Sequence, residues 1–251
     1  MSGHSKWASI KHKKGAADAK RGKIFTKLIK EITVAARIGG GDPDGNPRLR
    51  TAILISKSKN MPVDNINRAI KKGTGELEGV HYEEVTYEGY GPGGAAIFLE
   101  AMTDNKNRTV SEIRAALGKA GGNLGENGCV GWMFEQKGFI TVKTNAKSED
   151  ELMELVIDVG ADNIQSIDDF YEITTTVASF ETVRKALEEA GVPMETAEMT
   201  RIPQNTVTVD EKKGKALLKL MDILDDHDDI QKAYSNFDIP DDVMNAILEN
   251  H

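Results

Sequence analysis

The spacing of apolar residues changes from a helical to a strand pattern near Gly79, and this change most restricts the folds open to the chain. Before it, apolar residues recur at intervals of three and four, the spacing of one helix face. After it, short runs rich in β-branched and aromatic residues alternate with amphipathic helices. A chain of 251 residues with such a change suits two or three domains. We therefore expect an α+β protein whose small helical domain comes first.

Three helices are predicted before Gly79. The first covers about residues 16–38 and buries a stripe made of Phe25, Leu28, Ile29, Ile32 and Ala36. At about 100° per residue, the opposite side of this helix carries a lysine ridge, composed of Lys20, Lys23, Lys27 and Lys30. The second helix opens at Asn46-Pro47 and turns Leu49, Ile53 and Leu54 inward. The third covers about residues 65–72, with Asp64 as its N-cap.

Strands and helices alternate in the rest of the chain. Residues 81–90 and 95–103 predict a β-hairpin, and an amphipathic helix follows at 109–121. Residues 128–203 predict a ferredoxin-like module of order ββαβαβ, whose first two strands turn at Lys137-Gly138. The tail predicts two strands and two helices. Neither 80–127 nor 204–251 makes a complete sheet core alone, so the two are expected to combine.

The expected fold class is therefore α+β, with a small N-terminal helical domain and two α/β domains. The ferredoxin-like domain is inserted into a discontinuous middle domain. The expected boundaries are a mobile basic arm at 1–15, the helical domain at 16–79, the middle domain at 80–127 and 204–251, and the insertion at 128–203.

The net charge of −8 hides a strong asymmetry. Residues 1–80 hold 17 Lys and Arg against 7 Asp and Glu, a net +10, whereas residues 81–251 hold 15 against 33, a net −18. Such asymmetry indicates a polyanion-binding segment on an acidic body. Lysine and arginine side chains gain affinity for phosphates by releasing counterions. The sequence thus predicts that the basic N-terminal region binds nucleic acid.

The candidate nucleic-acid-binding residues come from the arm, the lysine ridge and the third helix. They are Lys6, Trp7, Lys11, His12, Lys13, Lys14, Lys20, Arg21, Lys23, Lys27, Lys30, Arg68, Lys71 and Lys72. The Trp7 ring either stacks on an unpaired base or packs on the helical domain, and the sequence leaves both open. Helices two and three resemble a helix-turn-helix, although a generic helical hairpin has the same pattern.

No pattern predicts an enzyme, a cofactor or a metal. The segment Gly89–Gly94 matches G-x-G-x-x-G, but a strand rather than a helix follows it, so it is expected to be a turn. The five histidines show no metal-ligand spacing, and the acidic run at 222–229 lacks the glycine and closing glutamate of a calcium loop. The single cysteine, Cys129, is expected to be a packed thiol in a reducing compartment. No apolar run is long enough to span a membrane, and a cytoplasmic protein is expected.

Several long motifs resemble the YebC family over essentially the whole chain. They are GHSKW, AKRGKIFTKLIKEI, NMPVDNINRAIKKGTGE, YEGYGPGGAAIFLEAMTDNKNRTVSEIR and GGNLGENGCVGWMFEQKG. That family includes bacterial proteins regarded as transcriptional regulators and a mitochondrial translational activator of a cytochrome oxidase subunit. The resemblance implies three domains, the last inserted in the second, and a non-enzymatic cytoplasmic regulator. It also adds Lys106 and Arg108, in the matching loop at 103–109, as a candidate second contact.

Three functions follow as expectations. The first is a DNA-binding transcriptional regulator. The second is a ribosome-associated translation factor that binds ribosomal RNA and relieves stalls at proline-rich stretches. The third is a protein-interaction scaffold whose basic arm docks on an acidic partner. No small-molecule substrate and no membrane partner are expected, and the oligomeric state stays open.

Overall fold

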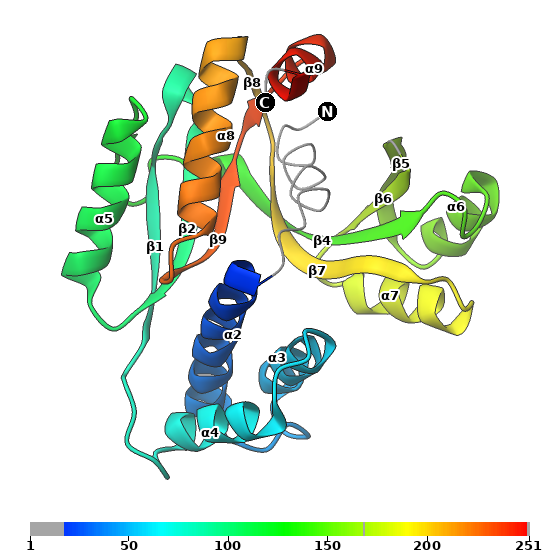
Figure 1. Ribbon diagram of the computed structural model, residues 1–251. Coiled ribbons are helices and arrows are strands. Elements are labelled where there is room, and N and C mark those ends of the chain that lie inside the picture. Colours follow the sequence, from blue (N-terminus) through cyan, green and yellow to red (C-terminus); the bar gives the residue numbers. More distant parts are fainter. Residues whose placement is uncertain (1–17, 168, 250–251) are drawn as a thin grey trace. The chain divides into compact units, whose positions relative to one another are not determined.

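The computed structural model describes residues 18–167 and 169–249. Helices and mainly antiparallel sheets make up this part of the chain, which confirms the expected α+β class (Figure 1). It divides into a main unit, within Met1–Gly131 and Asn205–His251, and an inserted unit, Trp132–Gln204. Within the described ranges, the helices are too short or too polar for one of them to span a membrane.

The N-terminal part of the main unit is a group of three helices. They are α2 (Asp18–Gly39), α3 (Pro47–Ser58) and α4 (Val63–Thr74). Their core joins Ile32 and Ala36 of α2 to Leu49 of α3 and Ile66 of α4. Two details differ from expectation. Leu54 is 61% exposed, because the inward face of α3 carries Leu49, Ala52 and Ser56 instead. Pro62 rather than Asp64 is the N-cap of α4, so Asp64 lies within the first helical turn.

Asn46 fixes the start of α3. Its side-chain oxygen accepts a hydrogen bond from the Leu49 amide at 3.1 Å. Its side-chain nitrogen donates to the Ala35 and Gly40 carbonyls, both at 2.8 Å. The residue is only 5% exposed, so one buried amide caps α3 and satisfies the end of α2.

Replacing Asn46 with alanine is expected to lower the free energy of unfolding by about 2–3 kcal/mol. The loss of the cap costs about 1 kcal/mol, and the loss of the buried hydrogen bonds to the Ala35 and Gly40 carbonyls accounts for the rest. Urea denaturation followed by circular dichroism measures this change. A Ser148→Ala variant, which removes an exposed cap from α6 (Glu149–Ile157), is the control, with an expected loss of about 1 kcal/mol or less. Equal losses in the two variants would contradict the role of the buried amide.

The main unit contains a four-stranded sheet in the order β3-β1-β2-β9. Its strands are β1 (Glu83–Tyr90), β2 (Ala96–Thr103), β3 (Asn123–Leu124) and β9 (Ile230–Ser235). The expected hairpin of β1 and β2 is confirmed. Strand β9 pairs antiparallel with β2, so segments that lie far apart in the sequence share one sheet. This pairing fits the expected insertion of one domain into another.

Two helices cover one face of this sheet (Figure 1). They are α5 (Lys106–Lys119) and α8 (Glu211–Asp225). Ile113 and Leu117 of α5 pack with Leu217 and Met221 of α8 over Leu99 of β2. Two-residue strands β8 (Val207–Thr208) and β10 (Phe237–Asp238) pair in parallel, and α9 (Asp241–Glu249) packs against α8.

The inserted unit is ferredoxin-like, with strand order β5-β6-β4-β7. Its elements follow the order βαββαβ rather than the expected ββαβαβ. They are β4 (Phe134–Lys143), α6, β5 (Ala161–Ile167), β6 (Phe170–Thr175), α7 (Phe180–Glu189) and β7 (Met194–Pro203).

The expected hairpin at Lys137-Gly138 is wrong, because β4 runs through these residues as one strand. Gly138 pairs with Thr175 and Met199 inside the sheet. A Cβ at this position would collide with the side chains of Thr175 and Phe180, so the glycine serves close packing and not a turn.

Candidate nucleic-acid interface

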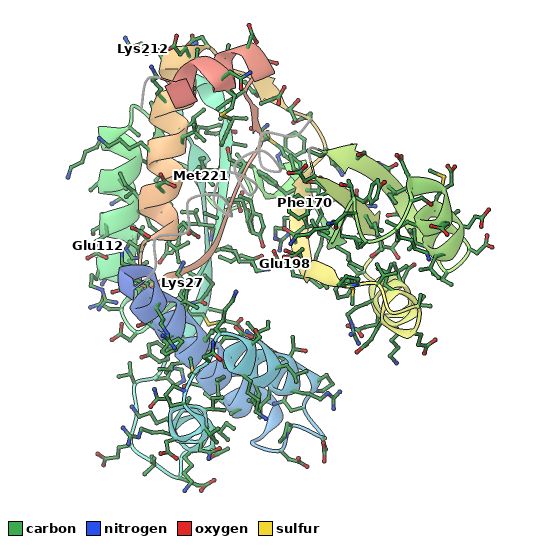
Figure 2. The ribbon with its side chains drawn as sticks, turned by 45° about the vertical axis from the view of Figure 1, so that its right-hand side comes forward. Lys27, Glu112, Phe170, Glu198, Lys212 and Met221 are labelled. Atoms are coloured by element: carbon green, nitrogen blue, oxygen red, sulfur yellow. The ribbon has the colours of Figure 1, made fainter. Side chains whose placement is uncertain are left out.

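Three lysines of α2 contact an acidic segment, residues 225–229, at the end of α8 and in the loop before β9. Lys23 Nζ lies 3.3 Å from Asp226 Oδ2. Lys27 Nζ donates to the Asp225 carbonyl at 2.6 Å. Lys30 Nζ lies 2.5 Å from Asp229 Oδ1 and donates to the Asp228 carbonyl at 2.8 Å. Lys27 lies in the first half of α2 and is labelled in Figure 2.

The lysine ridge is therefore not a solvent-facing surface along its length. Side-chain exposure falls from 41% at Lys23 to 16% at Lys27 and 7% at Lys30. The prediction that Lys30 belongs to an exposed binding ridge is wrong, because a buried carboxylate and two carbonyls surround its ammonium group. Lys27 is also largely buried, and its ammonium group donates to the Asp225 carbonyl. Lys23 differs, because it and its partner Asp226 both lie at the surface.

Asp229 is the centre of this contact. Its carboxylate accepts hydrogen bonds from Lys30, Arg108, Thr103 and Thr109, at distances from 2.5 to 3.2 Å. Burial raises the pKa of the Asp229 carboxyl, but the hydrogen bonds from Lys30, Thr109 and Arg108 outweigh this effect and hold the pKa below its ordinary value. Asp229 is thus a charged, fully paired group that joins α2, α5 and β9.

The two residues of the expected second contact take part in ion pairs within the main unit. Arg108 donates to Asp104 and Asp229, both at 2.8 Å, and these hydrogen bonds, Asp229 first, raise its pKa. Lys106 Nζ lies 2.6 Å from Glu83 Oε2. Both side chains are about half exposed, so contact with a polyanion stays a prediction for them, in competition with these carboxylates.

The basic residues of α4 differ from the lysines of α2 in their exposure and pairing. Arg68, Lys71 and Lys72 are exposed, and no ion pair engages them within the described residues. Lys57 and Lys59, at the end of α3, are also exposed and were missed by sequence reasoning, because each stands alone among polar residues. Exposed Arg21 lies over the Phe25 ring, with the guanidinium carbon 5.6 Å from the ring centre. These cations can meet phosphates without first breaking an internal pair.

A groove of about 460 Å³ lies between α3 and α4. Apolar side chains, one asparagine, two lysines and one glutamate line it together with loop residues. The lining consists of Gly41, Pro43, Ile53, Lys57, Val63, Ile66, Asn67, Ile70, Lys71 and Glu76.

The remaining candidates fall outside what the structure describes. Lys6, Trp7, Lys11, His12, Lys13 and Lys14 precede residue 18, and the side chain of Lys20 is not described either. Their contact with nucleic acid stays a prediction.

The glycine-rich and cysteine motifs have structural roles. Residues 91–94 turn β1 into β2, as expected. The Glu88 carboxylate accepts hydrogen bonds from the amides of Gly128, Val130 and Gly131, each at 2.7 Å, and so fixes the loop that carries Cys129. Burial, followed by the Glu88 charge, raises the pKa of the Cys129 thiol. A raised pKa disfavours the reactive thiolate.

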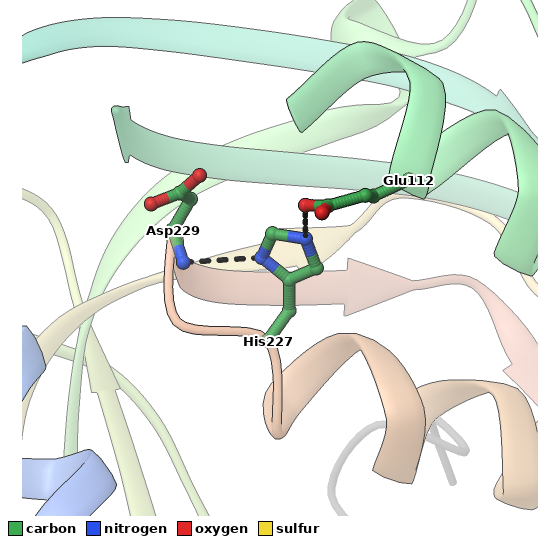
Figure 3. A group of neighbouring side chains, drawn as sticks. All are labelled: Glu112, His227 and Asp229. Carbon is green, nitrogen blue, oxygen red and sulfur yellow. Dashed lines mark hydrogen bonds and ion pairs between the residues drawn. The ribbon is translucent and has the colours of Figure 1, made fainter. Parts of the chain in front are cut away.

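Glu112, His227 and Asp229 lie close together, with ligand atoms within 4.8 Å of one another (Figure 3). The His227 Nδ1 accepts from the Asp229 amide at 3.1 Å, and its Nε2 lies 3.0 Å from Glu112 Oε2. Since Asp229 is also paired with Lys30 and Arg108, each of these groups already has a partner. The cluster is therefore a hydrogen-bonded link between α5 and the loop before β9.

Two family models match this chain. The TACO1/YebC protein N-terminal domain matches residues 5–76, and the TACO1/YebC second and third domain matches residues 82–237.

Curated relatives of similar length match almost end to end. A probable transcriptional regulatory protein of Desulfosudis oleivorans is 61% identical over 246 residues, which cover 98% of this chain and 100% of the relative. One of Geobacter sulfurreducens is 59% identical over 248 residues, covering 99% and 100%. The crystal structure of a conserved hypothetical protein from Aquifex aeolicus has 51% identity and a TM-score of 0.81, covering 89% of this chain and 93% of that one.

Proposed function

Because this chain belongs to the TACO1/YebC family, we propose that it is a non-enzymatic, cytoplasmic regulator of gene expression that binds nucleic acid. The observation that carries the proposal is the basic N-terminal region on an otherwise acidic chain. Within the described residues, its exposed cations include Arg21, Arg68 and the lysines at the ends of α3 and α4. Phosphate contacts of this kind give affinity and position but do not select a sequence.

DNA is the first candidate partner, since the relatives are named probable transcriptional regulatory proteins. In a helix-turn-helix the start of the second helix enters the major groove. Here Asp64 lies in the first turn of α4, and the basic residues Lys71 and Lys72 lie in its last turn. This distribution favours backbone contacts by the end of α4 over reading of bases by its start.

Ribosomal RNA is the second candidate, and the α3–α4 groove favours it. The groove offers apolar walls beside lysines, an arrangement suited to unpaired bases, which folded RNA displays in loops and bulges. In this reading the chain is a translation factor that acts on ribosomes, including those stalled at proline-rich stretches.

Sedimentation of a lysate through a sucrose gradient separates the two candidates. A translation factor is expected to move with ribosomes at low salt and to leave them at high salt, because phosphate contacts weaken as salt rises. A transcriptional regulator is expected to stay at the top, while the purified full-length chain protects a promoter from nuclease. A variant with Lys11, Lys13 and Lys14 changed to glutamine tests whether the basic arm makes these contacts. Co-sedimentation that is unaffected by salt and by this variant would count against nucleic-acid binding through the basic region.

A further inference from the structure

Exposed apolar side chains are concentrated in the helical part of the main unit. Of the twelve large apolar side chains exposed in the described chain, seven lie between residues 18 and 80. They are Ile24, Ile38, Leu54, Ile55, Val63, Leu77 and Val80. Exposed apolar residues that are scattered singly are normal, so only those that lie together at a groove indicate a binding surface. Val63 is the member of this set that also lines the α3–α4 groove, where it is 58% exposed.

The groove combines an apolar wall with a polar rim. Ile53, Ile66 and Ile70 continue the wall from Val63, and all three also touch or join the buried core of the helices, which fixes their positions. The volume of about 460 Å³ lies in the range of small-ligand sites. By volume, the groove is therefore large enough for a flat ring system.

The polar groups at the rim of the groove can contact both the phosphates and the base of a nucleotide. Lys57 and Lys71 lie on α3 and α4 respectively, and neither has an ion pair within the described residues, so both are available to phosphates. The Asn67 amide is exposed and offers a donor and an acceptor to the edge of a base. Glu76 accepts a hydrogen bond from Thr74 at 3.0 Å and keeps free acceptor capacity for base N–H groups.

We propose that the α3–α4 groove holds one unpaired base of an RNA strand, with the flanking phosphates against Lys57 and Lys71. The proposal rests on the proposed function and adds the form of nucleic acid that this surface selects. A base inside a duplex is stacked on both faces and cannot enter such a groove, whereas bases in RNA loops and bulges are available. Apolar side chains bind the faces of an extruded base, as enzymes that flip bases show.

A pair of matched variants tests the groove in the full-length chain. Val63→Glu places a carboxylate in the groove, and Leu54→Glu places one on an exposed face of α3 outside the lining. Both positions are more than half exposed, so both variants are expected to fold, and both change the net charge equally. The probes are a fluorescein-labelled 12-nucleotide single-stranded RNA, a blunt-ended RNA duplex of the same length annealed from two strands, and single-stranded DNA of the same sequence.

Val63→Glu is expected to weaken binding of the single-stranded RNA roughly tenfold more than Leu54→Glu does, from the lost base contact. The two variants are expected to bind the duplex equally. In the parent chain, 4-thiouridine placed in the RNA should crosslink to residues that line the groove, a readout that needs no variant.

The groove proposal would be overturned if the two variants bound single-stranded RNA equally well and the crosslinks formed outside the groove. That result would favour a protein as the partner of the groove. An equal tenfold effect on single-stranded DNA would overturn the choice of RNA. If the parent chain binds none of the probes at low salt, the proposed function itself fails, and this outcome is distinct from the other two.

Discussion

Replacing Asp229 with alanine is expected to lower the free energy of unfolding by about 3–5 kcal/mol. The substitution leaves the Lys30 ammonium group buried without its carboxylate, and it removes the acceptor of Thr103, Thr109 and Arg108. An uncompensated buried charge costs far more than an exposed pair contributes. Urea denaturation measures the change, with fluorescence and circular dichroism used as two probes of one transition.

The control for this variant is Asp226→Ala. Asp226 pairs with Lys23 at 3.3 Å, but both side chains are roughly half exposed, so the expected loss is within about 0.5 kcal/mol. The two variants remove the same charge from the same segment. If they destabilised the chain equally, the buried position of Asp229 would not be what makes it important.

The same carboxylate makes stability depend on pH. Its pKa in the folded chain lies below the ordinary value, so the unfolded chain binds the proton more tightly. This contribution is fully present above the unfolded-state pKa of about 3.9 and is lost as the pH falls through the folded-state pKa. The parent chain should therefore lose stability below about pH 4 more steeply than Asp229→Ala does.

Changing Lys11, Lys13 and Lys14 to glutamine is expected to weaken nucleic-acid binding by roughly 100-fold at 0.1 M salt. Each phosphate contact contributes about 0.9 to the slope of log affinity against log salt on duplex DNA, and about 0.7 on a single strand. The slope should therefore fall by about 2.7 or about 2.1. Fluorescence anisotropy at four or more salt concentrations measures both the affinity and the slope.

The matched control changes Lys143, Lys147 and Lys185 to glutamine. These lysines lie in the inserted unit, so the net charge changes by the same amount at a distant place in the sequence. This variant is expected to change the affinity by less than about threefold and to keep the slope, because only long-range electrostatics differ. A parallel loss in both triple variants would show that net charge, and not the arm, governs binding.

Local signals in the sequence were sufficient for most elements. The three-and-four spacing of Ile32 and its neighbours predicted α2, and Asn46-Pro47 placed the start of α3 correctly. Alternation around Gly-Pro-Gly-Gly predicted the β1–β2 hairpin. The sequence does not reveal strand β5, because Ile164 is its only buried apolar residue and no alternation of apolar and polar residues marks the strand.

The candidate site was harder to predict, because long-range pairing decides which charges are available. Helical periodicity placed Lys23, Lys27 and Lys30 on one face of α2. It could not show that Asp225–Asp229, almost two hundred residues later, would cover that face. The sequence showed only that the acidic run at 222–229 lacks the features of a calcium loop. Conversely, the sequence could not show that the cations of α4 would be exposed and without an ion pair within the described residues.

The pairing of β2 with β9 also has a consequence while the chain is being synthesised. Strand β2 is made early, whereas its neighbour β9 follows the complete inserted unit. The inserted unit is contiguous in the sequence, so it can form its own sheet first. Until β9 is synthesised, the edge of β2 that pairs with β9 has no partner strand. Unpaired edges of apolar strands are prone to pair with other chains. A nascent or truncated chain that ends before residue 230 therefore carries an open, aggregation-prone edge, which only full-length synthesis removes.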